Sequence, residues 1–221
     1  MLSAFITSFV AAFVTLFIVI DPVMVTPIFA SLTRGDTPRE QRRTALNAAI
    51  IAAGVLTFFA FFGSFMLHHL GISMAAFRAA GGLLLFLMGF RMFFEPDGEL
   101  EAKRPGPKAS ARDNIAFYPI ALPLLAGPGA IATVMLLMGD NREKFEGSAS
   151  QMAAVGGVLA SVYVTLVCGV IFMSFAAKVS SALGRTGMNM ISRLLGMLLM
   201  ALSTQYIFDG IRVGVLERVG S

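Results

Sequence analysis

The segment IVIDPVMVTPIF, residues 18–29, places one carboxylate and two prolines inside an otherwise apolar stretch. No charged residue occurs between Ala4 and Ile20, and the residues directly after Pro27 are again apolar. Proline lacks the backbone N–H that a helix needs, and its ring clashes with the preceding turn. The residue before a proline also avoids the helical conformation. The segment therefore predicts a helix that is interrupted next to Asp21.

The composition indicates that this segment lies in a membrane. Of the 221 residues, 57% are hydrophobic and only 14% are charged, and the mean hydropathy is +0.79. A water-soluble domain of this size cannot bury so much apolar surface. We therefore expect an all-α, polytopic membrane protein, with a single transmembrane domain over residues 1–221. Six apolar tracts are long enough to cross a bilayer, at residues 4–33, 44–67, 74–94, 115–138, 152–176 and 188–211.

The basic residues follow the expected membrane topology. The net charge is +4, but Lys and Arg are scattered over short loops without interleaved aromatic residues, which argues against nucleic acid as a partner. The loops after the first, third and fifth tracts, together with Arg91, hold eleven Lys and Arg residues, and the opposite side holds five. The positive-inside rule then predicts that both termini lie outside the cytoplasm.

The second half of the chain repeats the proline pattern of the first half. Pro22 and Pro27 are five residues apart, and Pro123 and Pro128 repeat this spacing 101 residues later. Each proline pair is followed by small and apolar residues. The repeat predicts that the first and the fourth tract are both broken helices.

The ends of the two halves match as well. An Arg-x-x-Gly pattern opens the last tract of each half, at Arg78–Gly81 and at Arg193–Gly196. The chain then divides into a first repeat, a polar cytoplasmic linker and a second repeat, at residues 1–94, 95–113 and 114–212. Because each repeat has an odd number of tracts, the second repeat enters the membrane from the opposite side. Two inverted three-helix repeats with broken helices are characteristic of secondary transporters.

Asp21 is the first candidate site residue. A carboxylate at the centre of a spanning helix costs about 3 kcal/mol and usually marks an ion or substrate path. Its position before Pro22 fits three roles: capping or structural pairing, coupling of protons or cations, and direct contact with a substrate. Pro22 and Pro27 free backbone carbonyls, which a membrane tolerates only when they are packed in protein or face a watery cavity. Thr26 adds a hydroxyl to the same segment.

The second half has no acidic residue at its proline motif and has glycines there instead. Pro123 and Pro128 interrupt this tract, and Gly127 and Gly129 permit close approach of a ligand or of the facing half. A helix that begins near Pro128 presents free N–H groups and a positive dipole end to a substrate carboxylate, while a plain kink is the alternative. Thr133 contributes a second hydroxyl.

Arg78 and Arg193 are the remaining candidates, because both lie near helix starts within apolar tracts. Their side chains either extend to the lipid head groups or pair with an acid or an anionic substrate. The adjacent His68 and His69 lack further ligands, so no metal site is predicted. No phosphate-binding glycine loop and no Ser-His-Asp arrangement indicates an enzyme, and no cofactor is expected.

At these motifs the chain resembles the MarC family of bacterial and archaeal integral membrane proteins, over nearly its whole length. The family often has Asn where this chain has Asp21, and Gly where it has Met24. The resemblance implies a six-span inner-membrane protein of transporter type, distantly similar to LysE-type exporters. The segments that carry it are DPVMVTPIFASLT (21–33), GISMAAFRAAGGLLLFLMGFRMF (71–93), YPIALPLLAGPGAIATV (118–134) and ISRLLGMLLMALSTQYIFDGI (191–211).

These observations favour an ion-coupled secondary transporter of small metabolites. Some archaeal relatives resemble transporters of small neutral amino acids, so neutral amino acids are the expected substrates, with H⁺ or Na⁺ as the coupling ion. The substrate site is expected between residues 21–29 and 123–133, and the lipid bilayer is the surrounding partner. The alternatives are a non-transporting membrane component that binds a partner protein and a channel-like leak. The sequence leaves the oligomeric state open.

Overall fold

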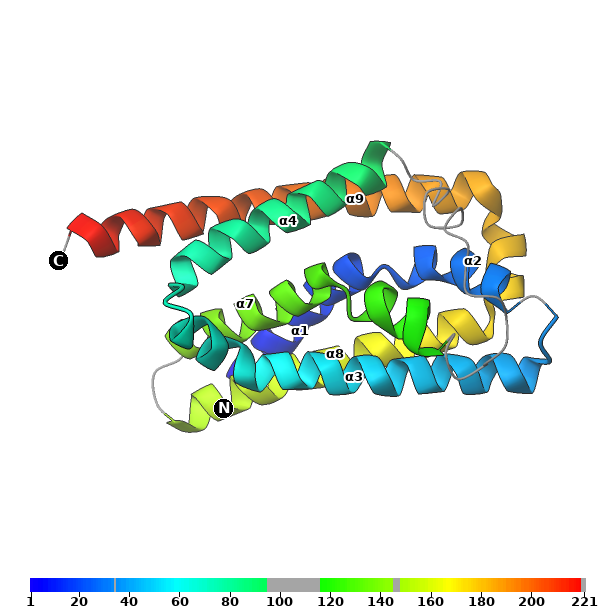
Figure 1. Cartoon of the computed structure of the whole chain (residues 1–221), viewed down its shortest axis with the longest axis horizontal. Helices are drawn as coiled ribbons and strands as arrows, with labels where there is room; N and C mark the ends of the chain where they lie inside the picture. Colours follow the sequence, from blue (N-terminus) through cyan, green and yellow to red (C-terminus); the bar gives the residue numbers. More distant parts are fainter. Residues whose placement is uncertain (34, 95–115, 145–147, 220–221) are drawn as a thin grey trace.

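The computed structural model describes residues 1–33, 35–94, 116–144 and 148–219, so the linker expected at 95–113 lies outside the described residues. Every element in the described part of the chain is helical. Figure 1 shows the helices running along one common axis, with the N-terminus and the end of the last helix at the same end of the molecule. In chain order the elements are α1 (Leu2–Ile20), α2 (Pro22–Leu32), α3 (Pro38–His69), α4 (Met74–Phe94), η1 (Ala116–Leu125), α7 (Pro128–Lys144), α8 (Ser148–Ser174) and α9 (Ala176–Val219).

The expected all-α membrane fold is confirmed, with one difference in the fourth tract. That tract forms two shorter elements, η1, whose backbone is interrupted at Tyr118 and Leu122, and α7, and neither reaches spanning length within the described residues. The first tract is also broken, into α1 and α2, which together are long enough to cross. Five stretches are long and apolar enough to cross a membrane: Leu2–Leu32, Pro38–His69, Met74–Phe94, Ala149–Ser174 and Thr186–Val215.

The outer surface of the bundle carries large apolar side chains. Ile6, Val10 and Val14 follow one exposed face of α1, and Leu83 and Leu87 do the same on α4. Water-soluble proteins rarely expose such continuous apolar surface. The multi-pass helices with this surface therefore imply the lipid bilayer as their environment.

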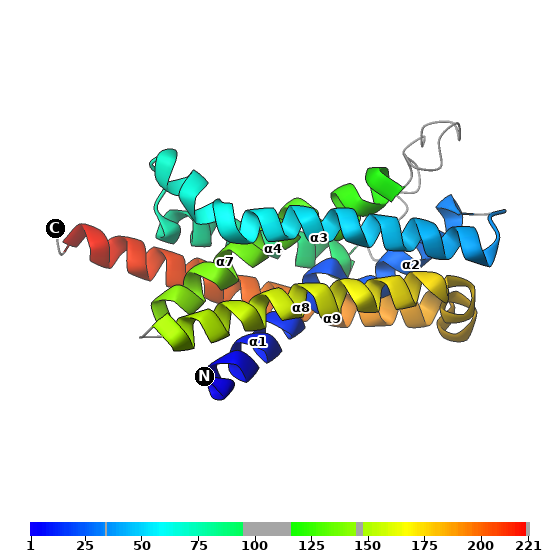
Figure 2. The same cartoon turned by 90° about the horizontal axis from the view of Figure 1, so that it is seen from below.

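The helices form two groups that the short elements connect. α4 packs along α9, and α3 packs on α8, η1 and α7, while α1 packs on α8 (Figure 1). α2 contacts both α8 and α9, and α7 contacts both α3 and α4. Figure 2 shows α3 and α8 side by side and the N-terminal part of α1 projecting from the bundle. The two broken tracts thus lie between the α4–α9 pair and the remaining helices.

Local sequence signals explain where the long helices begin. At the start of α3, the Thr37 hydroxyl accepts a hydrogen bond from the Glu40 N–H, and the Glu40 carboxylate accepts one from the Thr37 N–H at 2.9 Å. This capping box satisfies two backbone donors that the first turn leaves free. α9 contains a bend at Gly184, whose φ of 61° favours glycine, and its spanning part begins at Thr186.

Candidate functional site

Asp21 forms the junction between α1 and α2. Its backbone is left-handed (φ 46°, ψ 69°), and within the described ranges it is the only non-glycine residue with a positive φ. Asp and Asn adopt this conformation more readily than other side chains do. The Asp21 N–H donates to the Phe17 carbonyl at 3.0 Å and ends α1, and Pro22 then starts α2. The predicted break next to Asp21 is therefore confirmed.

The Asp21 side chain caps the helix that follows it. The Met24 N–H donates to Asp21 Oδ1 at 3.2 Å, which satisfies one free donor in the first turn of α2. Pro22 occupies the first helical position, where a missing N–H has no cost. The capping role expected for Asp21 is thus confirmed, and it involves only one of its two carboxylate oxygens.

The second carboxylate oxygen of Asp21, Oδ2, takes no part in the helix cap. Asp21 is only 5% exposed, and its Oδ2 is buried without a hydrogen-bond partner among the residues that the structure describes. The carbonyls of Ile18, Val19 and Ile20 lie in the last turn of α1, where no intrahelical donor follows. A buried carboxylate without a partner is unfavourable unless a proton or a cation neutralises it. The junction therefore presents oxygen atoms suited to a cation or a proton.

The second break separates η1 from α7. Tyr118 and Leu122 have extended backbones inside η1, as expected for residues that precede prolines. The Ala126 N–H donates to the Ala121 carbonyl at 2.9 Å and closes η1. Gly127 follows as a non-helical residue, and α7 begins at the next position.

Both prolines of the second pair follow an interruption of the helix, as the sequence predicts, whereas in the first half only Pro22 does so. The sequence pairs Pro22 with Pro123 and Pro27 with Pro128. In the structure, Pro22 and Pro128 each begin a helix, while Pro27 lies inside α2 and Pro123 lies within η1. The helix after the second break begins at Pro128, as the sequence predicts, and the backbone is also extended at Leu122, directly before Pro123.

The hydroxyl groups near the breaks differ in their bonding. Thr26 is fully buried and donates to the Pro22 carbonyl at 2.7 Å, so its hydroxyl is engaged within α2. Thr133 is also fully buried, but its Oγ1 has no hydrogen-bond partner in the described part of the chain. Gly127 is buried and Pro128 is exposed. Thr133 is therefore the second polar side chain, after Asp21, with unused bonding capacity beside a break.

Gly129 serves helix packing in this structure. A Cβ atom placed on Gly129 would collide with the Met88 side chain of α4, and it would lie 3.4 Å from Leu85 Cδ2. Of the two expected uses of this glycine, the close approach of the facing half is therefore the one that the structure contains.

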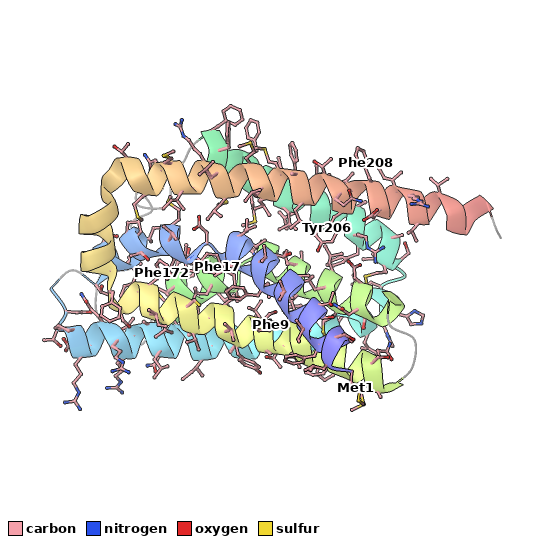
Figure 3. All side chains as sticks on the ribbon, turned by 180° about the vertical axis from the view of Figure 1, so that it is seen from behind. Met1, Phe9, Phe17, Phe172, Tyr206 and Phe208 are labelled. Atoms are coloured by element: carbon pink, nitrogen blue, oxygen red, sulfur yellow. The ribbon has the colours of Figure 1, made fainter. Side chains whose placement is uncertain are left out.

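Both breaks belong to one buried cluster near the middle of the bundle. Val19 and Ile20 before the first break share this cluster with Ala126 and Ala130 around the second. Figure 1 and Figure 2 both show the α1–α2 junction and the η1–α7 junction near the middle of the long axis. α8 supports the first junction from the side, because Phe17 and Phe172 have ring centroids 6.4 Å apart (Figure 3).

The two candidate arginines have different environments. Arg78 is 6% exposed and forms an ion pair with Asp140 of α7, with 2.5 Å between Nη2 and Oδ1. Arg193 is exposed on α9. Asp140 follows Pro128 by 12 positions, which corresponds to about 18 Å along a helix, so the ion pair lies toward the far end of α7. Sequence reasoning missed Asp140, although an arginine in an apolar tract signals the need for a nearby acid.

A second polar contact lies beside this ion pair. The Ser8 hydroxyl of α1 donates to Asn141 Oδ1 at 2.5 Å, and both residues are buried. Asn141 also donates to the Leu137 carbonyl at 2.7 Å. The C-terminal part of α7 is thus bound to α4 and to α1 by polar side chains. Within the described residues, no group of three or more His, Cys, Asp or Glu side chains has the spacing of a metal site.

Comparison with known proteins agrees with the membrane fold. A UPF0056 membrane protein of Aquifex aeolicus is 34% identical over 198 residues, which cover 88% of this chain and 87% of the relative. One from Methanocaldococcus jannaschii is 35% identical over 206 residues, with 92% and 86% covered. The UPF0056 membrane protein YvbG of Bacillus subtilis is 31% identical over 198 residues, with 89% and 90% covered.

No solved structure matches the chain. The family model for the MarC family integral membrane protein matches residues 6–215, which include both breaks and all or most of every candidate span. This match and the relatives that cover the chain almost from end to end show that it belongs to the MarC family of integral membrane proteins.

Proposed function

We propose that this protein is an ion-coupled secondary transporter of small polar metabolites such as neutral amino acids. The substrate site lies between the two broken tracts, near the middle of the membrane. Asp21 takes up the coupling ion, either H⁺ or Na⁺. The candidate residues for this site remain those that the sequence predicts, Asp21, Pro22, Thr26 and Pro27 in the first half, and Pro123, Gly127, Pro128, Gly129 and Thr133 in the second.

The observation that carries this proposal is the unused oxygen of Asp21. A residue that only caps a helix needs one acceptor atom, and asparagine or serine supplies one without a charge. Asp21 keeps a second oxygen that is buried and has no hydrogen-bond partner among the described residues, directly after the last turn of α1. Helix C-terminal carbonyls and a carboxylate are the groups that discontinuous helices use to bind Na⁺ or H⁺ in transporters.

The pattern of helix contacts supports an inverted repeat. α1 and α2 pack on α8, and η1 and α7 pack on α3. α2 packs on α9, and α7 packs on α4. Exchange of the two halves replaces α1, α2, α3 and α4 by η1, α7, α8 and α9. Under this exchange each of these contacts becomes another contact in the same set, and the α4–α9 and α3–α8 contacts are unchanged. This exchange is what a two-fold axis in the membrane plane would produce, with both termini on the non-cytoplasmic side by the positive-inside rule.

The Asp21→Asn variant is expected to lose gradient-driven uptake while folding normally. Asparagine retains an oxygen that accepts the Met24 N–H, and it tolerates the left-handed backbone, but it cannot carry a proton or balance a cation. Uptake of radiolabelled glycine and alanine is measured in proteoliposomes, under an imposed proton gradient and under an imposed Na⁺ gradient.

The control is Asp36→Asn, which removes a carboxylate from the loop before α3 and leaves the junction untouched. Uptake by this variant should match that of the parent protein. Unchanged gradient-driven uptake in Asp21→Asn would remove Asp21 from the mechanism. A parent protein that transports none of the neutral amino acids under either gradient would contradict the transporter proposal and favour a non-transporting component.

A further inference from the structure

α4 and α9 touch backbone to backbone. A Cβ atom placed on Gly89 would lie 2.7 Å from the carbonyl oxygen of Gly196, and one placed on Gly196 would lie 2.7 Å from that of Gly89. Near the other end of the contact, a Cβ atom on Gly210 would lie 2.6 Å from the Ala79 nitrogen. Contacts between main chains cannot adjust by a change of side-chain rotamer, so at these points neither helix moves far without the other.

The same α4 helix meets α7 through side chains. A Cβ atom placed on Gly139 of α7 would lie 3.1 Å from the Met74 sulfur, and Gly129 packs against Met88 in the same way. Methionine is unbranched and has several rotatable bonds, so such contacts adapt when helices shift. The contact between α4 and α9 therefore resists relative movement of the two helices, whereas the contact between α4 and α7 can adjust to it.

Two neighbouring glycines show this contrast at one level of α4. A Cβ atom on Gly82 would lie 2.9 Å from the Ser203 carbonyl oxygen of α9. A Cβ atom on Gly81 would lie 3.2 Å from Leu136 Cδ1 and 3.7 Å from the Ala132 Cβ, both on α7. Ser203 of α9 and Ala132 of α7 are both buried, so the two positions are matched in burial.

The Arg78–Asp140 ion pair is the charged contact that crosses from α4 to α7. It lies one turn beyond Gly81 and Gly82, toward the end of the molecule that holds the N-terminus. Tyr206 of α9 is within electrostatic range of both charges, and Figure 3 shows it on the inner side of α9 while Phe208 points outward. A buried ion pair is weak support for stability, and a role in selecting one of two arrangements is its best-attested use.

We infer that α4 and α9 move as one unit against the rest of the bundle, and that the Arg78–Asp140 ion pair holds this unit against α7 at the end where both chain termini lie. Release of the ion pair separates α4 from α7 there and admits water toward the second break, while the contact between α4 and α9 stays closed. The assignment of this motion to a transport cycle depends on the proposed function, but the motion itself does not.

Thiol labelling of two matched positions tests this inference. The native Cys168 is first replaced by serine, and Ala132→Cys or Ser203→Cys is then introduced into the full chain in liposomes. N-ethylmaleimide reacts with a thiol only where water reaches it, because the thiolate is the reactive form. The Arg78→Gln substitution is expected to raise the labelling rate of Ala132→Cys by about tenfold or more, as loss of a buried ion pair shifts the equilibrium. The rate for Ser203→Cys should change less than about twofold, since main-chain contacts keep α4 and α9 together.

Two results would overturn the inference. An unchanged rate at Ala132→Cys would show that the ion pair does not hold α4 against α7. Equal acceleration at Ala132→Cys and Ser203→Cys would show that α4 and α9 do not move as a unit. If Arg78→Gln does not fold, the double variant Arg78→Gln/Asp140→Asn, which leaves no uncompensated charge, is judged by the same two rates. Labelling requires no substrate, so its outcome is independent of whether the protein transports.

Discussion

Replacement of Arg78 by methionine is expected to lower the free energy of unfolding by about 3–5 kcal/mol, because it removes the guanidinium that pairs with the Asp140 carboxylate. Arg78 is almost fully buried between α4 and α7, and the Asp140 side chain is 15% exposed, so water compensates little for the loss. Methionine fills a similar length without a charge. The free energy of unfolding is measured in mixed micelles by titration with SDS, followed by far-UV circular dichroism.

Arg193 supplies the matched control for this substitution. It occupies the corresponding Arg-x-x-Gly position of the second half but is exposed on α9, so Arg193→Met should change stability by less than about 0.5 kcal/mol. The double variant Arg78→Met/Asp140→Leu should recover most of the loss, since replacement of both charges by apolar side chains is often neutral. Equal losses in Arg78→Met and Arg193→Met would contradict a structural role for the ion pair.

The Gly196→Ala variant is expected to lower the free energy of unfolding by about 1–3 kcal/mol through overpacking. The added methyl group would lie 2.7 Å from the Gly89 carbonyl oxygen and 2.9 Å from the Phe93 nitrogen, so α4 and α9 must move apart. Alanine favours a helix over glycine by up to about 1 kcal/mol, which offsets only part of this loss. The same SDS titration measures the effect.

Gly54→Ala is the control, because this glycine of α3 has no atom within 4 Å of where its Cβ would lie. It should stabilise the protein by about 0.5–1 kcal/mol through helix propensity alone. A Gly196→Ala variant that is as stable as Gly54→Ala would mean that α4 and α9 are not in main-chain contact in the membrane.

The features predictable from the sequence are those with local causes. The break at Asp21 follows from two adjacent residues. Asp21 caps the helix that follows, and Pro22 cannot continue the helix that precedes it. The five candidate spans follow in the same way from the length of the apolar tracts. At these positions the structure that the local sequence favours is also the one found in the folded protein.

The missed features depend on contacts between distant segments. Asp140 pairs with Arg78 across 62 positions, and only the packing of α7 against α4 brings the two side chains together. The sequence also does not show that Pro27 continues α2, whereas its counterpart Pro128 begins α7 after the non-helical Gly127. The difference between Arg78 and Arg193 has the same origin, because similar local motifs face protein in one case and the outside of the bundle in the other.

The left-handed backbone of Asp21 does not require a charged side chain. Asparagine adopts the same conformation and supplies the same capping oxygen, and the codons of the two residues differ by a single base. A lineage can therefore acquire or discard a negative charge at membrane depth in one mutational step, without redesigning the bend between the two helices. Homologues with either residue at this point would share the bend between the two helices while differing in the charge that they bury there.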